Sequence, residues 1–268
     1  MRPPEGQLPA YDRPPVVEVA LAIQFESAIG YRSVDLAQIA EPWQDMLPNV
    51  SERPPLAPIA VEPDRPAVAL KLSDETETPR LWLQNKEGSQ LLQLQQDRLV
   101  VNWRKLPMDT PYPRYATIRA FLVEAWKRLS RVVEHLDLTL PPPSISEVLY
   151  VNRPEVEDSH DSPDGMSTIV APWTGSMSDE FLPTPSGAGF FTRFELPNGR
   201  GWLAIEGQSG QSGDGRRITG LNLVSRGRAS SPDLDGALDF MDLAHEWIVR
   251  GFTCITTAEA HNRWGRTI

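Results

Sequence analysis

Hydrophobic and polar positions along the chain follow two periods, one typical of strands and one typical of helices. The apolar stretch from Val16 to Glu26 is rich in β-branched residues and predicts a buried strand. Ser33 is a suitable cap for a short helix that Pro42 should kink or shorten. The apolar positions of this helix are Leu36, Ile39, Ala40, Trp43 and Leu47. The proline-rich residues 48 to 66 have little periodicity, so we expect an irregular extended connection there.

Alternating residues then predict several short strands and, after them, a long helix. The strands are expected at 67 to 72, 80 to 84, 90 to 95 and 98 to 103. Turn-forming residues at 86 to 89 and at 96 to 97 indicate an antiparallel meander. From Tyr112 the period changes to 3.6, which predicts an amphipathic helix with Pro113 in its first turn. Its apolar face consists of Ile118, Phe121, Leu122, Ala125, Leu129 and Val132.

The second half of the chain repeats this order of elements. A strand is expected at 145 to 152, a second meander between 190 and 225, and a second long helix after Ser231-Pro232-Asp233. Only the short helix has no amphipathic counterpart between 152 and 190. Residues at matching places are Glu18 and Glu147, Gly88 and Gly199, Asn102 and Asn222, and Trp126 and Trp247. We therefore predict an internal duplication, with an extension at 1 to 13, a first repeat at 14 to 140, and a second at 141 to 268 that includes the C-terminal helix and tail.

This order of elements predicts an α+β protein in which each meander buries one face under helices. A unit of strand, helix, antiparallel meander and long helix, repeated once, is the order of the saddle-shaped TATA-binding-protein-like fold. The alternative is a helix-grip fold, in which a single curved sheet wraps the final helix.

Composition and charge narrow the class of protein. The chain has 268 residues, 26 of them proline, which argues against a bundle of long helices. Its formal charge of -10 disfavours general affinity for nucleic acid. No stretch is long and apolar enough for a membrane span and Met1 to Tyr11 does not resemble a signal peptide, so we expect a cytoplasmic protein with no membrane partner. The one cysteine, Cys254, excludes thiolate zinc sites and is expected to be a buried small residue after the last helix.

Sequence motifs for catalysis, cofactors and metals are absent. The segment Gly-Gln-Ser-Gly-Gln-Ser-Gly at 207 to 213 lacks the spacing of a serine-hydrolase elbow and is interpreted as a hairpin loop. No glycine-rich stretch has the pattern of a dinucleotide or phosphate loop, so we predict no cofactor. The acidic loop at 155 to 165 has the wrong spacing for calcium, so we predict no metal site and name no catalytic residue. Its candidate ligands are Asp158, His160, Asp161 and Asp164.

Donor-rich and aromatic residues are the candidates for binding a partner or ligand. Arg98, Asn102 and Arg104 share one face of a strand, where they could bind an anion or instead satisfy the Asp97 turn and neighbouring helix ends. The full set of candidates comprises Arg98, Asn102, Trp103, Arg104, Asn152, Arg153, His245 and Trp264. Asn152 and Arg153 also suit a helix end, and Trp264 also suits a packing anchor for the tail.

Several of these segments resemble a known family. They are Pro-Pro-Val-Val-Glu at 14 to 18, the stretch from Leu92 to Lys105, Tyr-Pro-Arg-Tyr at 112 to 115, Tyr-Val-Asn-Arg at 150 to 153, and the closing helix with Phe252 and Trp264-Gly265. They look like a sporadically distributed family of uncharacterised bacterial and archaeal proteins of similar length, with no established activity, cofactor or catalytic residue. Its patchy distribution implies mobile genes, such as accessory, phage-defence or toxin-antitoxin components.

Three classes of function follow from these patterns. The first is a non-catalytic interaction or sensing protein, with a neighbouring-gene product as its partner. The second is a nucleic-acid or nucleotide binder that uses the sheet face through Arg98, Asn102, Trp103 and Arg104, although the net charge disfavours nucleic acid. The third is an enzyme whose site is assembled from the acidic loop and His245 or His261. The missing catalytic motifs favour the first class.

Overall fold

The computed structural model describes residues 7–60, 78–106, 111–156, 165–173, 181, 187–211, 213 and 217–267. The protein is α+β, and its nine strands form one large antiparallel sheet in the order β2-β3-β4-β5-β1-β6-β9-β8-β7. We expected one sheet for each meander, whereas the strand order joins both meanders because β1 lies beside β6. Contacts divide the chain into two units, each described by itself: the α2 unit (Val19–Val148 and Arg226–Asp242) and the α4 unit (Met1–Glu18, Leu149–Ser225 and Leu243–Ile268).

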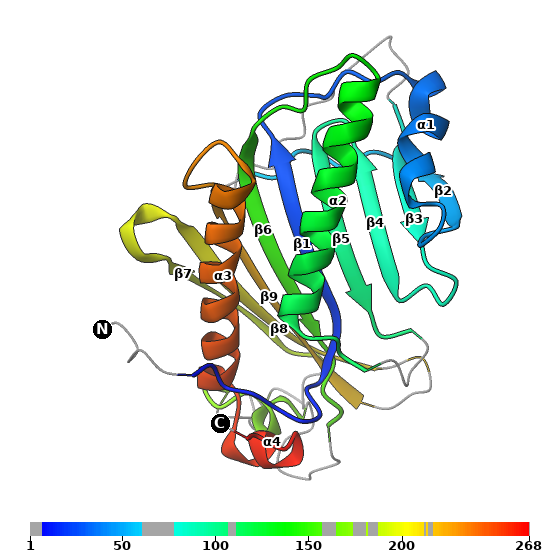
Figure 1. The fold of residues 1–268 in the computed structure, drawn as a ribbon. Helices are drawn as coiled ribbons and strands as arrows, with labels where there is room; N and C mark the ends of the chain where they lie inside the picture. The colour runs from blue at the N-terminus through cyan, green and yellow to red at the C-terminus, as the bar shows by residue number, and fades with distance from the viewer. Residues whose placement is uncertain are drawn as a thin grey trace. The chain divides into compact units, whose positions relative to one another are not determined.

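The α2 unit contains the first meander and the helices that follow the predicted periods (Figure 1). Its strands are most of β1 (Val16–Phe25), β2 (Asn49–Arg53), β3 (Arg80–Gln84), β4 (Gln90–Gln95), β5 (Arg98–Arg104) and the first part of β6 (Pro143–Asn152). Its helical elements are η1 (Ser33–Asp35), α1 (Leu36–Ala40), η2 (Glu41–Trp43), α2 (Tyr115–His135) and the start of α3 (Leu234–Ile255). The start of α3 is where the sequence predicted it, because the carboxylate of Asp233 accepts a hydrogen bond from the amide of Gly236.

Two details of this unit differ from the sequence prediction. Strand β2 lies within the segment expected to be irregular. The sequence did not predict it because an exposed edge strand with only one apolar residue shows no alternation of apolar and polar positions. Helix α2 begins at Tyr115, so Pro113 precedes the first turn. The strand predicted at 67 to 72 lies outside the described residues. Helix α1 ends just before Pro42, as expected.

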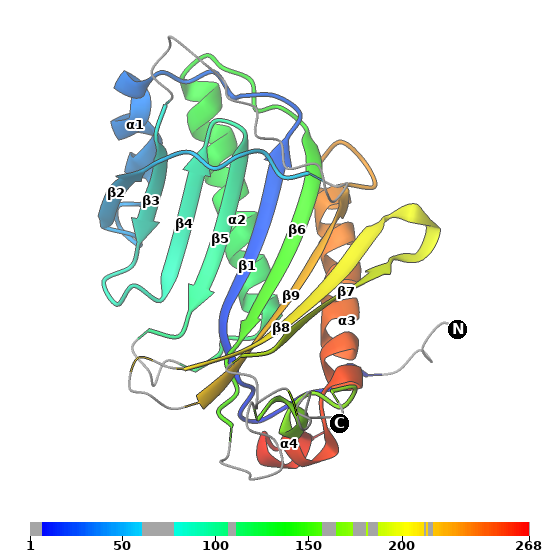
Figure 2. The same ribbon diagram turned by 180° about the vertical axis from the view of Figure 1, so that it is seen from behind.

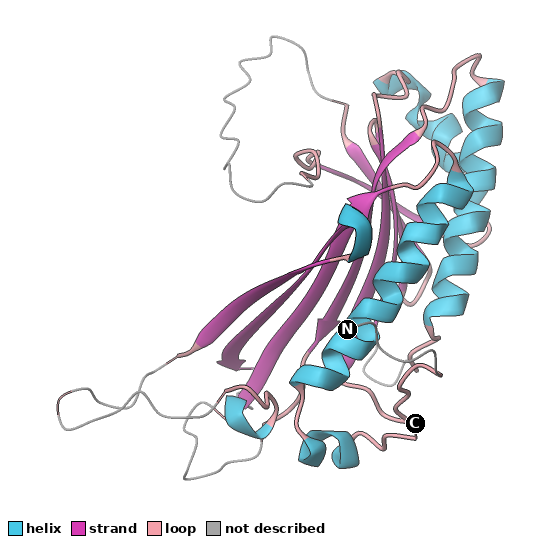
Figure 3. Cartoon of the chain, turned by 90° about the vertical axis from the view of Figure 1, so that its left-hand side faces the viewer, coloured by secondary structure: helices cyan, strands magenta, loops and turns pink. Residues whose placement is uncertain are grey.

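Strand alternation gives the sheet of the α2 unit one apolar face. Leu83 pairs with Leu92, which pairs with Val101, and residues directly opposite each other point to the same side of a sheet. Helices α1 and α2 cover this face, as the front and side views show (Figures 1 and 3). The buried residues of this face include Leu81, Leu83, Leu92, Leu94, Leu99, Val101 and Trp103. The opposite face of β2 to β5 is turned toward the viewer in Figure 2.

The α4 unit contains the second meander. Its elements are the start of β1, the rest of β6, η3 (Met166–Thr168), β7 (Gly189–Glu195), η4 (Pro197–Gly199), β8 (Gly201–Gln211), most of β9 (Arg217–Arg228), the rest of α3, and α4 (Ala258–Arg263). The glycine- and serine-rich stretch expected to be a loop lies in part within β8, because Gly207 pairs with Phe190 of β7. The prediction for Cys254 was wrong: it lies within α3, and its side chain is exposed. Among the described residues, no helix is long and apolar enough to cross a membrane.

Candidate functional site

Polar side chains gather on the face of β2 to β5 that the helices leave uncovered. The β3 sequence Arg-Leu-Trp-Leu-Gln alternates, so Arg80, Trp82 and Gln84 point away from the apolar face formed by its leucines. Trp82 pairs with Ser51 of β2 and Gln93 of β4, which extends the polar face over the neighbouring strands. On this face of β5 lie the predicted residues Arg98, Asn102 and Arg104.

The indole of Trp82 lies at the centre of three arginines. The guanidinium carbons of Arg53, Arg80 and Arg104 lie 5.2, 5.5 and 5.6 Å from the centroid of its ring. A tryptophan ring attracts cations at this distance through its quadrupole, with an energy of about 0.5–2 kcal/mol per cation. The ring therefore compensates part of the repulsion among three like charges. We call these four residues the arginine cluster.

Hydrogen bonds position the arginine cluster, but those between described residues leave much of its donor capacity unused. The Oε1 atom of Gln93 accepts from Nη1 of Arg80 at 2.8 Å and from Nε1 of Trp82 at 3.0 Å, and its Nε2 donates to Asn102 at 2.7 Å. Nη2 of Arg104 donates only a long bond of 3.5 Å to the carbonyl of Gly88. In the described part of the chain, the Nε atoms of Arg80 and Arg104 are buried and have no acceptor.

Among the described residues, no carboxylate neutralises these arginines. Within the described ranges, none of the ion pairs involves Arg53, Arg80 or Arg104. Glu52 is adjacent to Arg53 but points to the other side of β2, because successive strand residues alternate. Burial lowers the pKa of the Arg80 guanidinium, and the positive charges of Arg98 and Arg53 lower it further. An anion bound here would relieve this accumulation of positive charge.

Arg98 has a different role, because it holds a segment of backbone against the same face. Its Nη2 donates to the carbonyl of Ala57 at 2.8 Å and to Oε1 of Gln24 at 3.1 Å. Gln95 accepts from the amide of Leu56 and donates to its carbonyl, and Gln24 binds both backbone groups of Ile59 in the same way. The segment from Leu56 to Ile59, here called the strap, thus crosses the face (Figure 2). Arg98 is only 5% exposed, and burial lowers its pKa, so it is a structural residue of the strap.

The other predicted residues lie away from this cluster. Trp103 is on the opposite, apolar face of β5, is 4% exposed and packs against Tyr112. Asn152 donates to the carbonyl of Leu221 at 3.1 Å, and Arg153 donates to Oδ1 of Asn222 at 3.0 Å. Burial lowers the pKa of Arg153. Both side chains thus support the backbone at the end of β6.

The C-terminal candidates take part in packing within the α4 unit. His245 stacks on Tyr150, and its Nδ1 lies 3.0 Å from the tyrosine hydroxyl. Trp264 contacts Tyr11, Phe252 and His261 through its ring. These contacts tie the tail to α3 and to the N-terminal segment. The candidate metal ligands Asp158, His160, Asp161 and Asp164 lie outside the described residues, and the described ones hold no cluster of three or more His, Cys, Asp or Glu that could bind a metal.

Sequence reasoning missed Arg53, Arg80, Trp82 and Gln93. The alternation in β3 is the signal that could have found two of them, because it places Arg80 and Trp82 on the polar face. Arg53 could not be found in this way, since β2 was not predicted. Gln93 is an alternating polar position of β4, but the contacts that it makes depend on the strand register.

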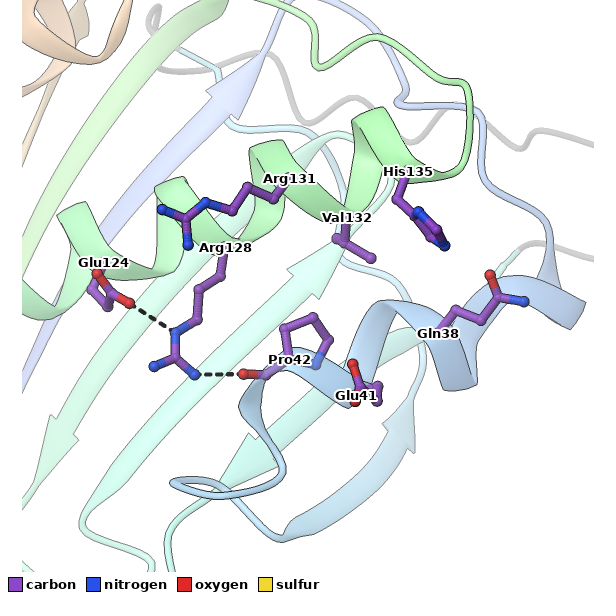
Figure 4. A pocket seen from close by; sticks show the side chains of 8 residues that line it. All are labelled: Gln38, Glu41, Pro42, Glu124, Arg128, Arg131, Val132 and His135. Atoms are coloured by element: carbon purple, nitrogen blue, oxygen red, sulfur yellow. Dashed lines mark hydrogen bonds and ion pairs between the residues drawn. The ribbon is translucent and has the colours of Figure 1, made fainter.

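A hollow lies between α1 and α2 (Figure 4). Arg128 lines it, but its guanidinium is already occupied by Glu124, Asp45 and the carbonyl of Pro42. The hydrogen bond to Glu124 is the main cause of the raised pKa of Arg128. Arg131 and His135 also line this hollow, together with the carboxylates of Glu41 and Glu124. Its mixed charges make it a weaker candidate for an anion than the arginine cluster.

Comparisons with known proteins give little further information. No family model and no curated protein matches the chain. Among solved structures, the chain is similar to DynU16, a protein from the dynemicin biosynthetic locus, with 15% identity over 71% of this chain and 77% of that chain. The TM-score is 0.28, which is too low to support a conclusion about fold or function.

Proposed function

We propose that this protein is a non-catalytic sensing protein that binds a small phosphate-bearing ligand, such as a nucleotide, at the arginine cluster. The observation that carries the proposal is the gathering of Arg53, Arg80 and Arg104 around Trp82, with no carboxylate paired to any of them among the described residues. Guanidinium groups that have no acid partner among the described residues provide unused donors on this polar face, in a positive field.

The chemistry of the donors favours phosphate. Arginine presents a planar fork of N–H groups that matches phosphate oxygens, and charge-assisted hydrogen bonds are about twice as strong as neutral ones. The stacking of the guanidiniums on one indole restricts their motion, so less entropy is lost when an anion binds. The formal charge of -10 repels a long polyanion and therefore favours a small ligand over nucleic acid.

Binding measurements with several phosphate compounds distinguish a small nucleotide from nucleic acid as the ligand. We expect pyrophosphate and ATP to bind the full chain and raise its melting temperature, and single-stranded DNA to bind more weakly at 150 mM salt. The variant R53Q/R80Q/R104Q removes three cations while keeping polar side chains, and each lost bond to phosphate should weaken binding about 10–100-fold.

The matched control for this panel is R131Q, which removes one charge from the hollow of Figure 4 on the other side of the sheet. R131Q should bind ATP like the wild type. If R131Q lost ATP binding while the triple variant kept it, the binding site would be that hollow and not the arginine cluster. Preferential binding of single-stranded DNA would replace the nucleotide by nucleic acid, and no binding of any probe would overturn the proposal.

We also propose that the fold is an internally duplicated saddle of the TATA-binding-protein-like type. The strand order supports this, because β5, β4, β3 and β2 follow β1 outward in one direction, while β9, β8 and β7 follow β6 in the other. A single continuous sheet also suits the helix-grip alternative, but the mirrored order favours duplication. Experimental coordinates in which residues 14–140 and 141–268 do not superpose would overturn it.

The resemblance to a family of mobile genes supports a proposal about the biological system in which this sensing protein acts. We propose that the protein acts in the cytoplasm as an accessory component of a phage-defence or toxin-antitoxin type system, with a neighbouring-gene product as partner. Co-expression with the neighbouring genes should yield a stoichiometric complex on purification. If the chain purified without any of the neighbouring-gene products, the proposed role in such a system would be contradicted.

A further inference from the structure

Strand β7 is an unusually apolar edge of the sheet. It is the last strand in the order and pairs only with β8 among the described strands. Its sequence is Gly-Phe-Phe-Thr-Arg-Phe-Glu, and Phe191 and Phe194 are 67% and 42% exposed. Edge strands with exposed apolar side chains pair readily with another strand, and natural proteins normally protect them.

The pairing with β8 defines which backbone groups of β7 point outward. The amide of Ser209 donates to the carbonyl of Ala188, and the amide of Leu196 donates to the carbonyl of Gly201. Bonded residues alternate along an antiparallel pair, so the even-numbered residues of β7 bond to β8. The backbone groups of the odd-numbered residues therefore point away from the sheet. These residues are Gly189, Phe191, Arg193 and Glu195.

The β7 sequence is self-complementary about its central residue, Thr192. In an antiparallel pair of two β7 strands related by a two-fold axis at Thr192, Phe190 lies opposite Phe194 and Phe191 lies opposite Arg193. The first is an aromatic pair and the second a cation–π pair. Gly189 opposes Glu195, so no like charges meet, and the outward backbone groups of each copy face those of the other.

Three of the other registers fit less well. A one-residue slip would pair outward groups of one copy with residues already bonded to β8 in the other. A two-fold axis at Arg193 would place this residue opposite itself, and like charges directly opposite each other are destabilising. An axis at Phe194 would bring in Pro197, which has no N–H to donate.

The ring of Phe190 is already anchored for such a contact. It lies across the backbone of Gly207, where an added Cβ would be 2.1 Å from the phenylalanine Cε1 atom. Glycine at this place leaves room for the ring, which would clash with any larger side chain. The ring therefore presents a fixed apolar surface beside the edge, opposite the place that Phe194 of a second copy would take.

We infer that the β7 edge is the contact surface for a second copy of this chain, which pairs antiparallel through β7 about Thr192 and extends the sheet across a two-fold axis. This contact is independent of the proposed phosphate site. Self-complementarity is the reason for choosing a second copy over an unrelated strand, because an unrelated partner would not require the β7 sequence to match itself.

Sedimentation and cross-linking of the full chain test this contact. The wild type should sediment as a dimer at micromolar concentration. Phe191→Pro removes the outward N–H of this residue together with the ring that faces Arg193, and it should yield a monomer that still unfolds cooperatively. A monomeric wild type at 100 µM, or an F191P variant that stays dimeric, would overturn the inference.

Disulfide trapping then tests the register. In the background Cys254→Ser, Thr192→Cys places two thiols opposite each other in a pair without backbone hydrogen bonds, where the Cα atoms lie about 4.5 Å apart. Mild oxidation should give a covalent dimer. Glu195→Cys in the same background is the matched control, because its opposite residue is Gly189, and it should stay monomeric on a non-reducing gel. Equal trapping of both variants would contradict the register about Thr192.

Discussion

Replacing Trp82 by leucine should destabilise the protein in a salt-dependent way. Leucine keeps an apolar side chain but has no quadrupole to offset the charges of Arg53, Arg80 and Arg104. Three cation–π contacts of about 0.5–1 kcal/mol each, together with a hydrogen bond from Nε1 to Gln93 of about 1 kcal/mol, give a loss of about 2.5–4 kcal/mol in the free energy of unfolding.

The salt dependence distinguishes electrostatics from lost packing. Between 0.05 and 0.5 M NaCl the Debye length falls from roughly 14 Å to about 4 Å, which screens the repulsion that leucine leaves uncompensated. The destabilisation of W82L, measured by urea unfolding, should therefore shrink by about 1 kcal/mol at high salt. Trp103→Leu is the matched control, because Trp103 is buried on the other face beside Tyr112 and should lose stability equally at both salt concentrations. A W82L penalty that is independent of salt, or absent, would refute the role assigned to the ring.

Four further changes test other parts of the structure. Gln95→Leu removes both bonds to the backbone of Leu56 and should speed proteolysis of the strap at residues 56–59, whereas unchanged cleavage would show that Gln95 does not hold it. Gly207→Val places a side chain against the ring of Phe190, so it should lower the melting temperature and weaken the dimer; a variant with wild-type behaviour would contradict the contact. Burial and the charge of Arg266 lower the pKa of His261 in the folded protein. The contribution of neutral His261 to stability is therefore full above about pH 6.5, and it is lost as the pH falls through the folded pKa. His261→Gln should flatten the plot of unfolding free energy against pH below about pH 6.5. Phe240→Ala creates a cavity at a fully buried position and should cost about 3–5 kcal/mol in urea unfolding, while Val34→Ala at an exposed position should cost less than about 0.5 kcal/mol.

Much of the fold follows from periodicity, because buried faces impose it. The alternation in β3, β4 and β5 and the 3.6-residue period of α2 and α3 were sufficient to predict these elements. Strand β2 and helix α4 were missed because each is short and carries few apolar residues, so tertiary contacts determine them. Cys254 was assigned to the core on residue type alone, whereas its place on the solvent-exposed side of α3 decides its exposure.

The candidate site was only partly predictable. The shared face of Arg98, Asn102 and Arg104 follows from the period of a strand, and the register agrees with it. Arg98 binds the strap, whereas Arg104 lies beside Trp82. This difference depends on which strands are neighbours in the sheet, and a single sequence does not reveal the strand order. The arginine cluster draws its members from β2, β3 and β5, which are separated along the chain by up to about fifty residues.

The central claim is that Arg53, Arg80 and Arg104 bind a phosphate group, and a crystal structure of the full chain grown with ATP tests it most directly. The account predicts phosphate oxygens within hydrogen-bond distance of at least two of these three guanidiniums, on the face of the sheet opposite α2. Crystals in which ATP binds elsewhere, or in which the arginine cluster remains without phosphate at saturating ATP, would contradict it.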